Sequence, residues 1–403
     1  MTIAQGVKKV VSYKKQTGLG VAASGSGGQE LRRVTSTINL TKETFQSNEI
    51  RPDQQIADFR HGSKQSTGTL SGELSAGTYK DFLQSVLRRD FAAISSLTAA
   101  AVTIVASTGV ITFQTGNPLT GGFKIGNVVR ITAGSVNAAN LNKNLLVTAV
   151  TATTLTVKTL NGSALADNAT SITGVTVAAT GKTTYVPETA QTQDYYTVEH
   201  WFSDVAQSEV YTDIMQTNAQ VKIPANGMAT IDFPLVGLNV TTGTSQVLTS
   251  PTAITTGGVT AGVNGLLLVA GTPVAIVTSI DFDINGNIAV ADAVVGSLTR
   301  PDVFQGVVGA TGTFSAYFTD ATFRDYFINE TEVSIIVALT TDSTATADFV
   351  VFTMSRVKVG GADVTDGASG LTRTFPFTAL KNTAGGAAVA NLATTIMVQD
   401  SLA

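Results

Sequence analysis

The sequence has no cysteine and few charged residues among its 403. Without cysteine the chain forms no disulfide, and thiol chemistry and cysteine-ligated zinc are excluded. Charged residues make up 13% of the chain, against about 25% in ordinary globular proteins. The net charge is −4, so no overall basic field is present to hold nucleic acid tightly, and a high-affinity nucleic-acid binder is disfavoured.

Long apolar runs are also missing. The two most hydrophobic stretches, 97–113 and 266–280, fall short of the roughly 20 residues that a membrane-spanning helix needs. Both contain Ser, Thr, Gly or Pro, so we predict that they form strands and that the chain has no membrane segment. Four lysines precede residue 16 without a following apolar region, and we expect no signal peptide.

Residues typical of enzyme sites are scarce. The chain has two histidines, His61 and His200, which do not lie at the spacing of a metal site. No nucleophile motif accompanies them. We therefore predict no catalytic residue, no cofactor-binding residue and no metal ligand, and a chain that is not an enzyme.

The β-branched residues and 38 glycines are typical of an all-β protein, and the sequence repeats itself. GTLSGELSAGTYKDFL (68–83) matches GTFSAYFTDATFRDYF (312–327) at five of sixteen positions. Arg51-Pro52-Asp53 recurs as Arg300-Pro301-Asp302, and Val221-Lys222 recurs as Val357-Lys358. Three matches in the same order predict two copies of one domain.

In each copy a strand leads into a helix, which we predict to start at Thr78 and at Thr322. Asp81 and Asp325 follow three residues later, and this spacing predicts a capping box, in which both side chains bond the backbone at the helix start. In the first copy the next apolar residues recur at helical spacing and indicate an amphipathic helix that ends near Asp90: Tyr79, Phe82, Leu83, Val86 and Leu87.

The first copy contains more chain than the second. The offset between matching residues falls from 244 at Thr78 to 136 at Lys222, so about 108 residues are inserted in the first copy. Residues 97–182 hold six charged side chains and short apolar runs at 102–105, 110–113, 127–131, 145–150 and 154–157. We predict an inserted β-domain at 97–182, a first domain at 1–96 and 183–240, a linker at 241–265 and a second domain at 266–403.

One acid-rich stretch raises the question of a metal site. SIDFDINGNIAVAD (279–292) places Asp281, Asp283, Asn285, Gly286 and Asp292 close to the spacing of a calcium-binding EF-hand loop. An EF-hand also needs flanking helices, whereas here apolar residues alternate with the polar ones. Asn-Gly between alternating segments is a strong hairpin signal, so we favour two strands joined at Asn285-Gly286 over a calcium site.

The segment QSNEIRPDQQIADFRHGSKQSTGTLSGELS (46–75) and the helix TYKDFLQSVLRRD (78–90) resemble the major tail tube proteins of long-tailed (siphovirus-type) bacteriophages. The resemblance implies a mainly β fold with two tandem tail-tube-type β-sandwich, barrel-forming domains, each with a flanking α-helix, plus the inserted small β-domain. It also implies a structural virion protein that self-assembles into stacked rings, the conduit for DNA ejection into the host. Most members carry one such domain and form hexameric rings, so two domains per chain imply a homotrimer ring with pseudo-sixfold symmetry.

The resemblance also implies partners and a location. The partners are further copies of the chain, the tape measure protein within the lumen, the tail terminator, the distal tail protein and double-stranded DNA in passage. The location is the virion tail, after assembly in the host cytoplasm. The alternative is a secreted or surface-layer/adhesin-like bacterial β-protein, which would share the richness in Thr and Gly and the absence of cysteine.

Alternation along the predicted strands separates an apolar face from a polar face. Burial of the apolar face is the main favourable term in folding, so we predict that the polar face lines the channel, through Asn39, Thr41, Ser71, Glu73, Asp281 and Asp283. We also expect the arm 1–30 and the polar segment 47–66 to join successive rings, because both are too long and too polar to pack in their own domain.

Overall fold

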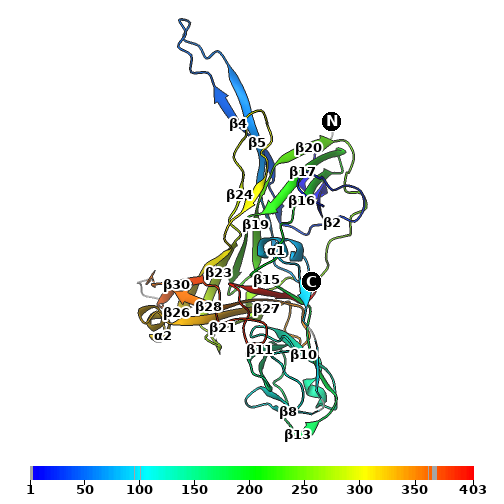
Figure 1. Ribbon diagram of the computed structural model, residues 1–403, viewed down its shortest axis with the longest axis vertical. Helices are drawn as coiled ribbons and strands as arrows, with labels where there is room; N and C mark the ends of the chain where they lie inside the picture. Colours follow the sequence, from blue (N-terminus) through cyan, green and yellow to red (C-terminus); the bar gives the residue numbers. More distant parts are fainter. Residues whose placement is uncertain (1–2, 95, 100, 362, 365–369) are drawn as a thin grey trace.

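The computed structural model describes residues 3–94, 96–99, 101–361, 363–364 and 370–403. The chain is mainly β, as predicted, and the described residues contain two α-helices and three short 3₁₀ turns, at Gly6–Lys8, Ala138–Asn140 and Gly262–Asn264. The molecule is elongated, with the hairpin of β4 and β5 projecting at one end and a separate lobe around β8 and β13 at the other (Figure 1). None of the helices within the described residues is both long and apolar enough to cross a membrane.

The first unit, formed by the described residues up to 94 together with 182–243, contains two antiparallel sheets. One runs in the order β4, β5, β19, β18, and the other in the order β2, β1, β16, β17, β20. The strands of the first sheet are β4 (Asn39–Gln46), β5 (Phe59–Glu73), β19 (Thr230–Gly237) and β18 (Asn218–Pro224), and β3 (Thr35–Ser36) also pairs with β5. Those of the second are β2 (Gln29–Glu30), β1 (Lys9–Lys15), β16 (Tyr196–Phe202), β17 (Gln207–Gln216) and β20 (Asn239–Gly243).

The second unit, formed by the described residues from 265 onward, shows the same succession of pairings. Strand β23 pairs with β26, β26 with β30, and β30 with β29, as β4, β5, β19 and β18 do in the first unit. Its strands are β21 (Gly265–Val269), β22 (Thr272–Pro273), β23 (Val277–Asn285), β24 (Ile288–Val290), β25 (Val303–Gln305), β26 (Gly309–Tyr317), β27 (Glu332–Thr340), β28 (Phe349–Val359), β29 (Asp363–Val364), β30 (Thr372–Ala379) and β31 (Met397–Asp400). Strand β15 (Lys182–Tyr185) joins β31 to β6 (Ala92–Ala93).

Each unit carries one helix against its core, α1 (Lys80–Leu87) and α2 (Thr322–Ile328). The apolar stripe predicted for the first helix is buried throughout, since its residues recur every three or four positions on one face. The ring of Tyr79 lies 5.7 Å from that of Phe233, and the ring of Phe323 lies 5.5 Å from that of Phe375. The two helices therefore cover equivalent positions of the two units.

The predicted capping boxes are wrong in both helices. The hydroxyl of Thr78 is buried and bonds Ser75 and Thr255 rather than the helix backbone, and α1 begins two residues later. The Asp81 carboxylate accepts from the Tyr13 hydroxyl at 2.7 Å. In the second unit Thr322 is already helical, its N–H donates to Asp320, and Asp325 pairs with Arg324. In the first unit, Thr78 and Asp81 bond residues outside the helix. In the second unit, the upstream acid Asp320 accepts the hydrogen bond from the start of the helix.

The predicted tight hairpin at Asn285-Gly286 is also wrong. Strand β23 pairs with β26 on one side and β18 on the other, while β24 pairs with β25. The chain turns away at Gly286 because its N–H donates to Thr217 O and its carbonyl accepts from Arg88. The acids of this stretch lie along a strand, and the described residues contain no cluster of three or more His, Cys, Asp or Glu able to hold a metal.

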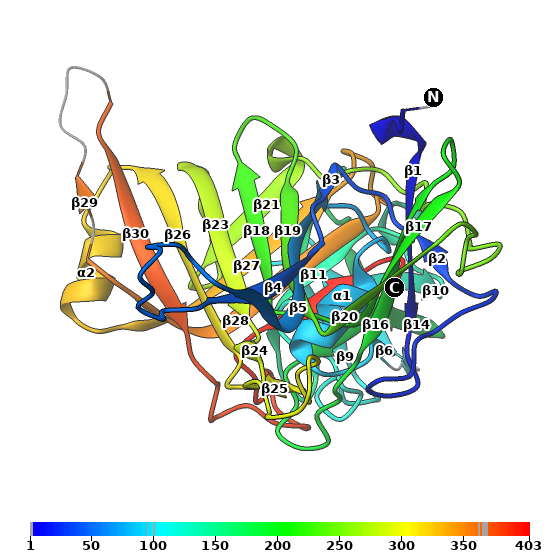
Figure 2. The same cartoon turned by 90° about the horizontal axis from the view of Figure 1, so that it is seen from above.

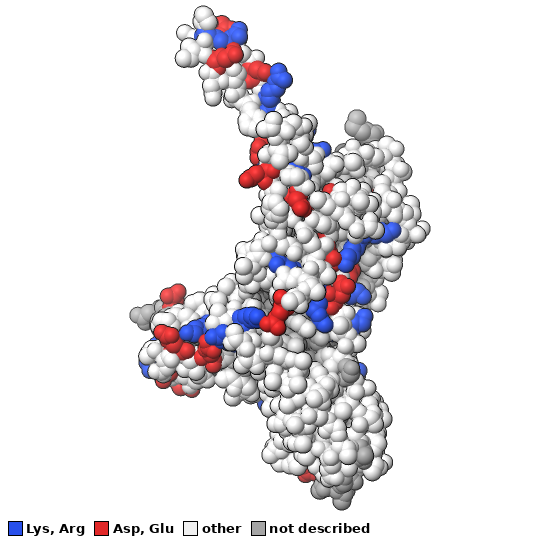
Figure 3. All heavy atoms as spheres, in the orientation of Figure 1, with Lys and Arg blue, Asp and Glu red and all other residues white. Residues whose placement is uncertain are grey.

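Residues 97–179 form an eight-stranded sheet of their own, in the order β13, β8, β9, β12, β11, β10, β14, β7. Its strands are β7 (Leu97–Ala99), β8 (Val102–Val105), β9 (Val110–Phe113), β10 (Val128–Ala133), β11 (Leu145–Val150), β12 (Thr154–Thr159), β13 (Asn168–Ile172) and β14 (Val175–Ala179). This lobe encloses a separate apolar core, and its face in Figure 3 shows very few charged side chains. We call it the inserted lobe.

The inserted lobe interrupts the first unit in sequence but packs against the second. Val128 and Leu146 of the lobe share a buried apolar cluster with Leu268, Ile336 and Phe349 of the second unit. The buried Gln399 side chain of β31 accepts from Val128 N at 2.8 Å and donates to Val128 O at 2.9 Å. The lobe is thus fixed to the face of β21, β27 and β28 that is turned away from the main core.

Candidate assembly surfaces

The two units are joined by a continuous backbone ladder. Residues 218–224 of β18 pair antiparallel with 279–285 of β23, so the sheets of both units merge into one. The merged wall runs in the order β4, β5, β19, β18, β23, β26, β30, β29. In Figure 2 the strands of this wall from β30 to β5 lie side by side. The junction between units is therefore strand pairing of the same kind as within each unit.

Side chains of the first unit reinforce this junction. Arg88, at the end of α1, donates to Gly286 O and Gly306 O, both at 2.7 Å. The Tyr195 hydroxyl donates to Asp302 at 2.9 Å, and burial, with the nearby Asp302 carboxylate, raises the pKa of Tyr195. A small buried apolar cluster contains residues of both units: Tyr195, Met215, Leu238, Ile288 and Val303. Strand β18 and Arg88, the residue after α1, together thus form the surface that receives β23 and its following loop.

The merged wall has one apolar and one polar face. The apolar face holds the buried residues Leu70, Val221, Phe233, Phe282, Phe314 and Phe375. All six residues predicted for the channel lie on the opposite face: Asn39 and Thr41 on β4, Ser71 and Glu73 on β5, Asp281 and Asp283 on β23. Register aligns Ser71, Asp232, Gln220, Asp283, Thr311 and Thr378 in one row across the wall.

The polar face carries an excess of negative charge. On the described strands from β5 to β26, the carboxylates of Glu73, Asp232, Asp281 and Asp283 share this face with the single ammonium of Lys222. Lys222 Nζ lies 3.4 Å from Asp232 Oδ2. Asp283 is half-buried and accepts from Asn218 Nδ2 at 2.8 Å, and burial raises its pKa against the lowering effect of that bond.

Lys222, Asp232 and Gln220 were not among the predicted channel residues. The signal that could have found them is present, because TIDFPLVG (230–237) and NAQVKIP (218–224) alternate as clearly as the stretch around Asp281. Their burial patterns alternate residue by residue in the structure. The same periodicity rule, applied to every strand, would have identified the whole polar face.

The two segments expected to join rings have different outcomes. Part of the N-terminal arm 1–30 packs in its own unit, contrary to the reason given for expecting it to join rings, because β1 pairs with β16 along its full length and buries Val11 and Tyr13. The polar segment 47–66 is shorter than expected, since β5 already begins at Phe59. The tip of the β4–β5 hairpin nevertheless projects from the molecule (Figure 1) and exposes four large apolar side chains: Phe45, Ile50, Ile56 and Phe59.

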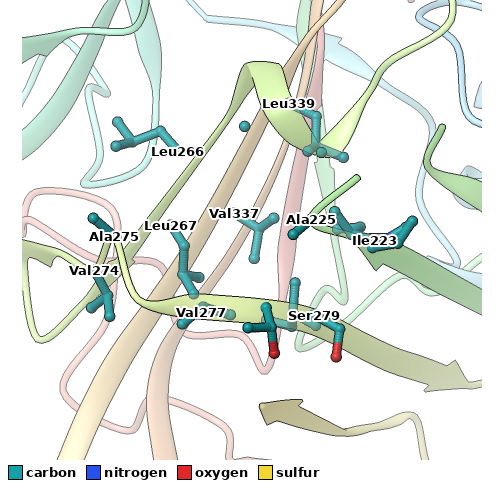
Figure 4. Close-up of a pocket in the computed structure, with 15 residues that line it drawn as sticks. Ile223, Ala225, Leu266, Leu267, Val274, Ala275, Val277, Ser279, Val337 and Leu339 are labelled. Atoms are coloured by element: carbon teal, nitrogen blue, oxygen red, sulfur yellow. The ribbon is translucent and has the colours of Figure 1, made fainter. Parts of the chain in front are cut away.

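A cavity of about 200 Å³ lies between β21, β23 and β27. Figure 4 shows its aliphatic lining, which includes Leu267, Val277 and Val337. Among the described residues that line it, none is an acid, a lysine, an arginine or a histidine. The cavity therefore offers apolar surface and no groups for acid–base chemistry.

A family model of known proteins covers most of the chain. The model of a family described as phage tail tube protein matches residues 6–379. The matched range takes in the inserted lobe, nearly all of the first unit and the second unit as far as the end of β30. A search of curated proteins finds no match.

Proposed function

The chain belongs to the phage tail tube protein family, and from that premise we propose that three copies close a ring and that stacked rings form the tube through which DNA leaves the virion. The observation that carries the proposal is the eight-strand wall, in which two units of like topology already pair edge to edge. We infer that the chain is a duplicated tube domain. The ladder between its units is then one of two kinds of seam, and the ladder between copies is the other.

Strand number supports three copies. Each chain supplies eight wall strands, so three chains supply 24. With strands about 4.8 Å apart and tilted by about 40°, a 24-stranded barrel has a backbone diameter of about 48 Å. Two copies would give 16 strands and about 32 Å by the same geometry, and inward side chains would fill much of that width. Three copies leave a wide aqueous lumen for double-stranded DNA, and closure removes every exposed strand edge.

The orientation of the wall follows from its two faces. The apolar face is covered by the helices and by the second layer of strands, so the polar face is the one available to line the lumen. Its excess of carboxylates repels phosphate, which lets DNA pass without being held. The tape measure protein would occupy the same lumen before ejection, and the tail terminator and distal tail protein would meet the two ends of the tube. We place the protein in the virion tail, after assembly in the host cytoplasm.

Added positive charge on the polar face tests this function. Thr311 and Thr313 are exposed on the polar face of β26, so Thr311→Lys with Thr313→Lys should leave tubes intact and slow DNA release from assembled particles. The effect should grow at low salt, where screening is weak. The matched control places two lysines on exposed turns of the inserted lobe, Ser107→Lys with Thr153→Lys. Equal release in both variants would reject the polar face as the lumen wall.

A further inference from the structure

The apolar cavity of Figure 4 lies at one rim of the wall, where the two units meet. Residues 223–225 at the end of β18 and 277–280 at the start of β23 line it, together with Leu267, Val337 and Leu339 of the second layer. A cavity of about 150 Å³ with an aliphatic lining holds a benzene-sized group. This cavity, at about 200 Å³, is therefore large enough for a branched aliphatic side chain.

Exposed apolar side chains lie around the cavity. Val263 follows the lining residue Gly262 and is 77% exposed. Met228 pairs with Ala261 and is also exposed. Ala275 lines the cavity and is itself exposed. Exposed apolar patches of this kind mark interaction sites, so the cavity offers a binding site for an apolar side chain of another molecule.

The β4–β5 hairpin leaves the wall at the opposite rim. In the ladder between the units, Pro224 lies at the cavity rim and Asn218 at the other end. Register across β19 places Glu73 of β5 on the side of the cavity rim and Ser66 on the other side. Residues 59–65 of β5 continue beyond Ser66, a length of about 23 Å. The hairpin therefore projects well past the wall, away from the cavity.

The loop at the tip of this hairpin, residues 47–58, is uncovered. Residues 48–58 are all exposed, and they include Ile50 and Ile56. Among the described residues, the hydrogen bonds of the loop stay within the hairpin, as between Arg51 and Asp53. Ordering such a loop costs conformational entropy, and contacts with a partner would offset this cost.

The matching segment of the second unit is held by its own chain. It connects β23 to β26 as 47–58 connects β4 to β5, and it carries the repeated motif Arg300-Pro301-Asp302. Asp302 accepts from the Tyr195 hydroxyl, whereas Asp53 in the first copy contacts Arg51 of its own loop. Of these two loops the first projects from the molecule (Figure 1). Each chain thus supplies one projecting loop and one cavity, on opposite rims.

We propose that the cavity receives the tip loop 47–58 of a second copy in the adjacent ring, and that Ile50 and Ile56 are the side chains that fill it. The inference rests on the proposed tube. Rings that stack in one direction bring one rim of each ring against the opposite rim of the next, the head-to-tail arrangement that builds an open filament. Three loops then meet three cavities at every ring boundary.

Removal of the apolar tip tests this contact. Ile50→Asp with Ile56→Asp changes two exposed residues, so the chain should still form rings. Tubes should be about tenfold shorter or more, because burial of one isoleucine is enough to change a binding constant about tenfold. Ala275→Trp, which blocks the cavity from an exposed position, should shorten tubes as well. The control, Val105→Asp at an exposed position of the inserted lobe, should give tubes of wild-type length.

Engineered cysteines identify the partner, since the chain has no cysteine of its own. A short bismaleimide added to tubes of Ile50→Cys/Ala275→Cys should produce dimers, trimers and longer covalent chains on a denaturing gel, because each link joins successive rings. Links within one ring of three would give no species larger than a trimer. The control, Ile50→Cys/Val105→Cys, should stay monomeric.

The outcomes separate this inference from the tube function. Tubes of wild-type length from the aspartate variant, cross-linked species no larger than a trimer, or equal cross-linking in the control would overturn the docking site and leave the tube function standing. If the aspartate variant forms no rings, the cysteine pair decides by the same criterion. A wild-type chain that forms no rings or tubes contradicts the function itself.

Discussion

Lys222 of the first unit lies directly opposite Asp281 of the second unit, in the ladder that joins β18 to β23. Both side chains are on the polar face, and Lys222 is also 3.4 Å from Asp232. Behind them, on the other face, Val221 lies opposite Phe282. The seam between units therefore places opposite charges side by side on the polar face and packs apolar residues on the core face, and several consequences can be measured.

The apolar side of the seam should dominate its stability. The ring of Phe282 is buried and lies 5.0 Å from that of Phe352. Phe282→Ala leaves a cavity in a packed core, so we expect a loss of about 3–5 kcal/mol in the free energy of unfolding. The exposed Phe304 of the same unit is the control, and Phe304→Ala should change stability by less than about 0.5 kcal/mol. Denaturant titration measures both free energies of unfolding. Equal effects of the two substitutions would show that packing of Phe282 does not dominate the stability of the seam.

The guanidinium of Arg88 should control the loop that follows β23. Arg88→Gln removes the donors to Gly286 O and Gly306 O, and the loss of bonds to a charged group should destabilise this region by about 2 kcal/mol. Hydrogen exchange should become faster in residues 286–306 and stay unchanged in the inserted lobe. Arg324→Gln, at an exposed pair with Asp325, should leave exchange in 286–306 unaffected. Unchanged protection in Arg88→Gln would show that the loop is held by its apolar contacts alone.

Removal of the inserted lobe should expose the second unit. Replacing residues 96–180 by a short linker uncovers Leu268, Ile336 and Val351, which are buried with the lobe in place. Such an apolar patch promotes aggregation, so we expect insoluble protein. Threonine at these three positions in the same deletion should restore solubility, because they lie on the outer face of their strands. Soluble protein from the plain deletion would mean that the lobe does not cover this face in solution.

Local sequence patterns predicted where several strands and the first helix lie, and which face of each strand is polar. The runs at 102–105, 110–113 and 145–150 are strands with the predicted bounds, because alternation and flanking turn residues are local properties. The stripe of α1 was predicted for the same reason. The polar residues of β4, β5 and β23 were likewise placed on one face by period alone.

The residues that each strand or turn contacts elsewhere in the molecule were not predictable, because they lie in distant parts of the chain. Nothing within 279–292 indicates that Gly286 binds Thr217 and Arg88, so the local hairpin signal was misleading. Thr78 has the spacing of a capping residue but is buried among Ser75 and Thr255. Val128 and Leu146 have the pattern of ordinary strand residues, and their packing against the second unit became visible only in three dimensions.

Stability should fall at acid pH through His200. The imidazole is buried beside Ser36, at 2.8 Å, and burial, then Lys9 and Arg33, lowers its pKa to about 3. It is therefore neutral near pH 7, despite Glu209 at 3.8 Å. An unfolded histidine titrates near pH 6.5.

Between about pH 6.5 and 3 the unfolded chain binds one more proton at this site than the folded chain, so stability falls as pH falls, by about 1.4 kcal/mol per pH unit. His200→Gln removes this proton uptake. Its unfolding free energy, measured from pH 7 to pH 4, should decline less steeply than that of the wild type. Parallel curves for the two proteins would show that His200 is protonated equally in both states.

The central claim is that three copies close one ring with the polar face of the wall turned inward. A cryo-electron microscopy reconstruction of tubes assembled from the purified chain tests it most directly. We expect three chains per ring, a barrel of 24 strands, and Asp281, Thr311 and Thr313 facing the lumen. Six chains per ring, or a lumen lined by any other face of the wall, would contradict it.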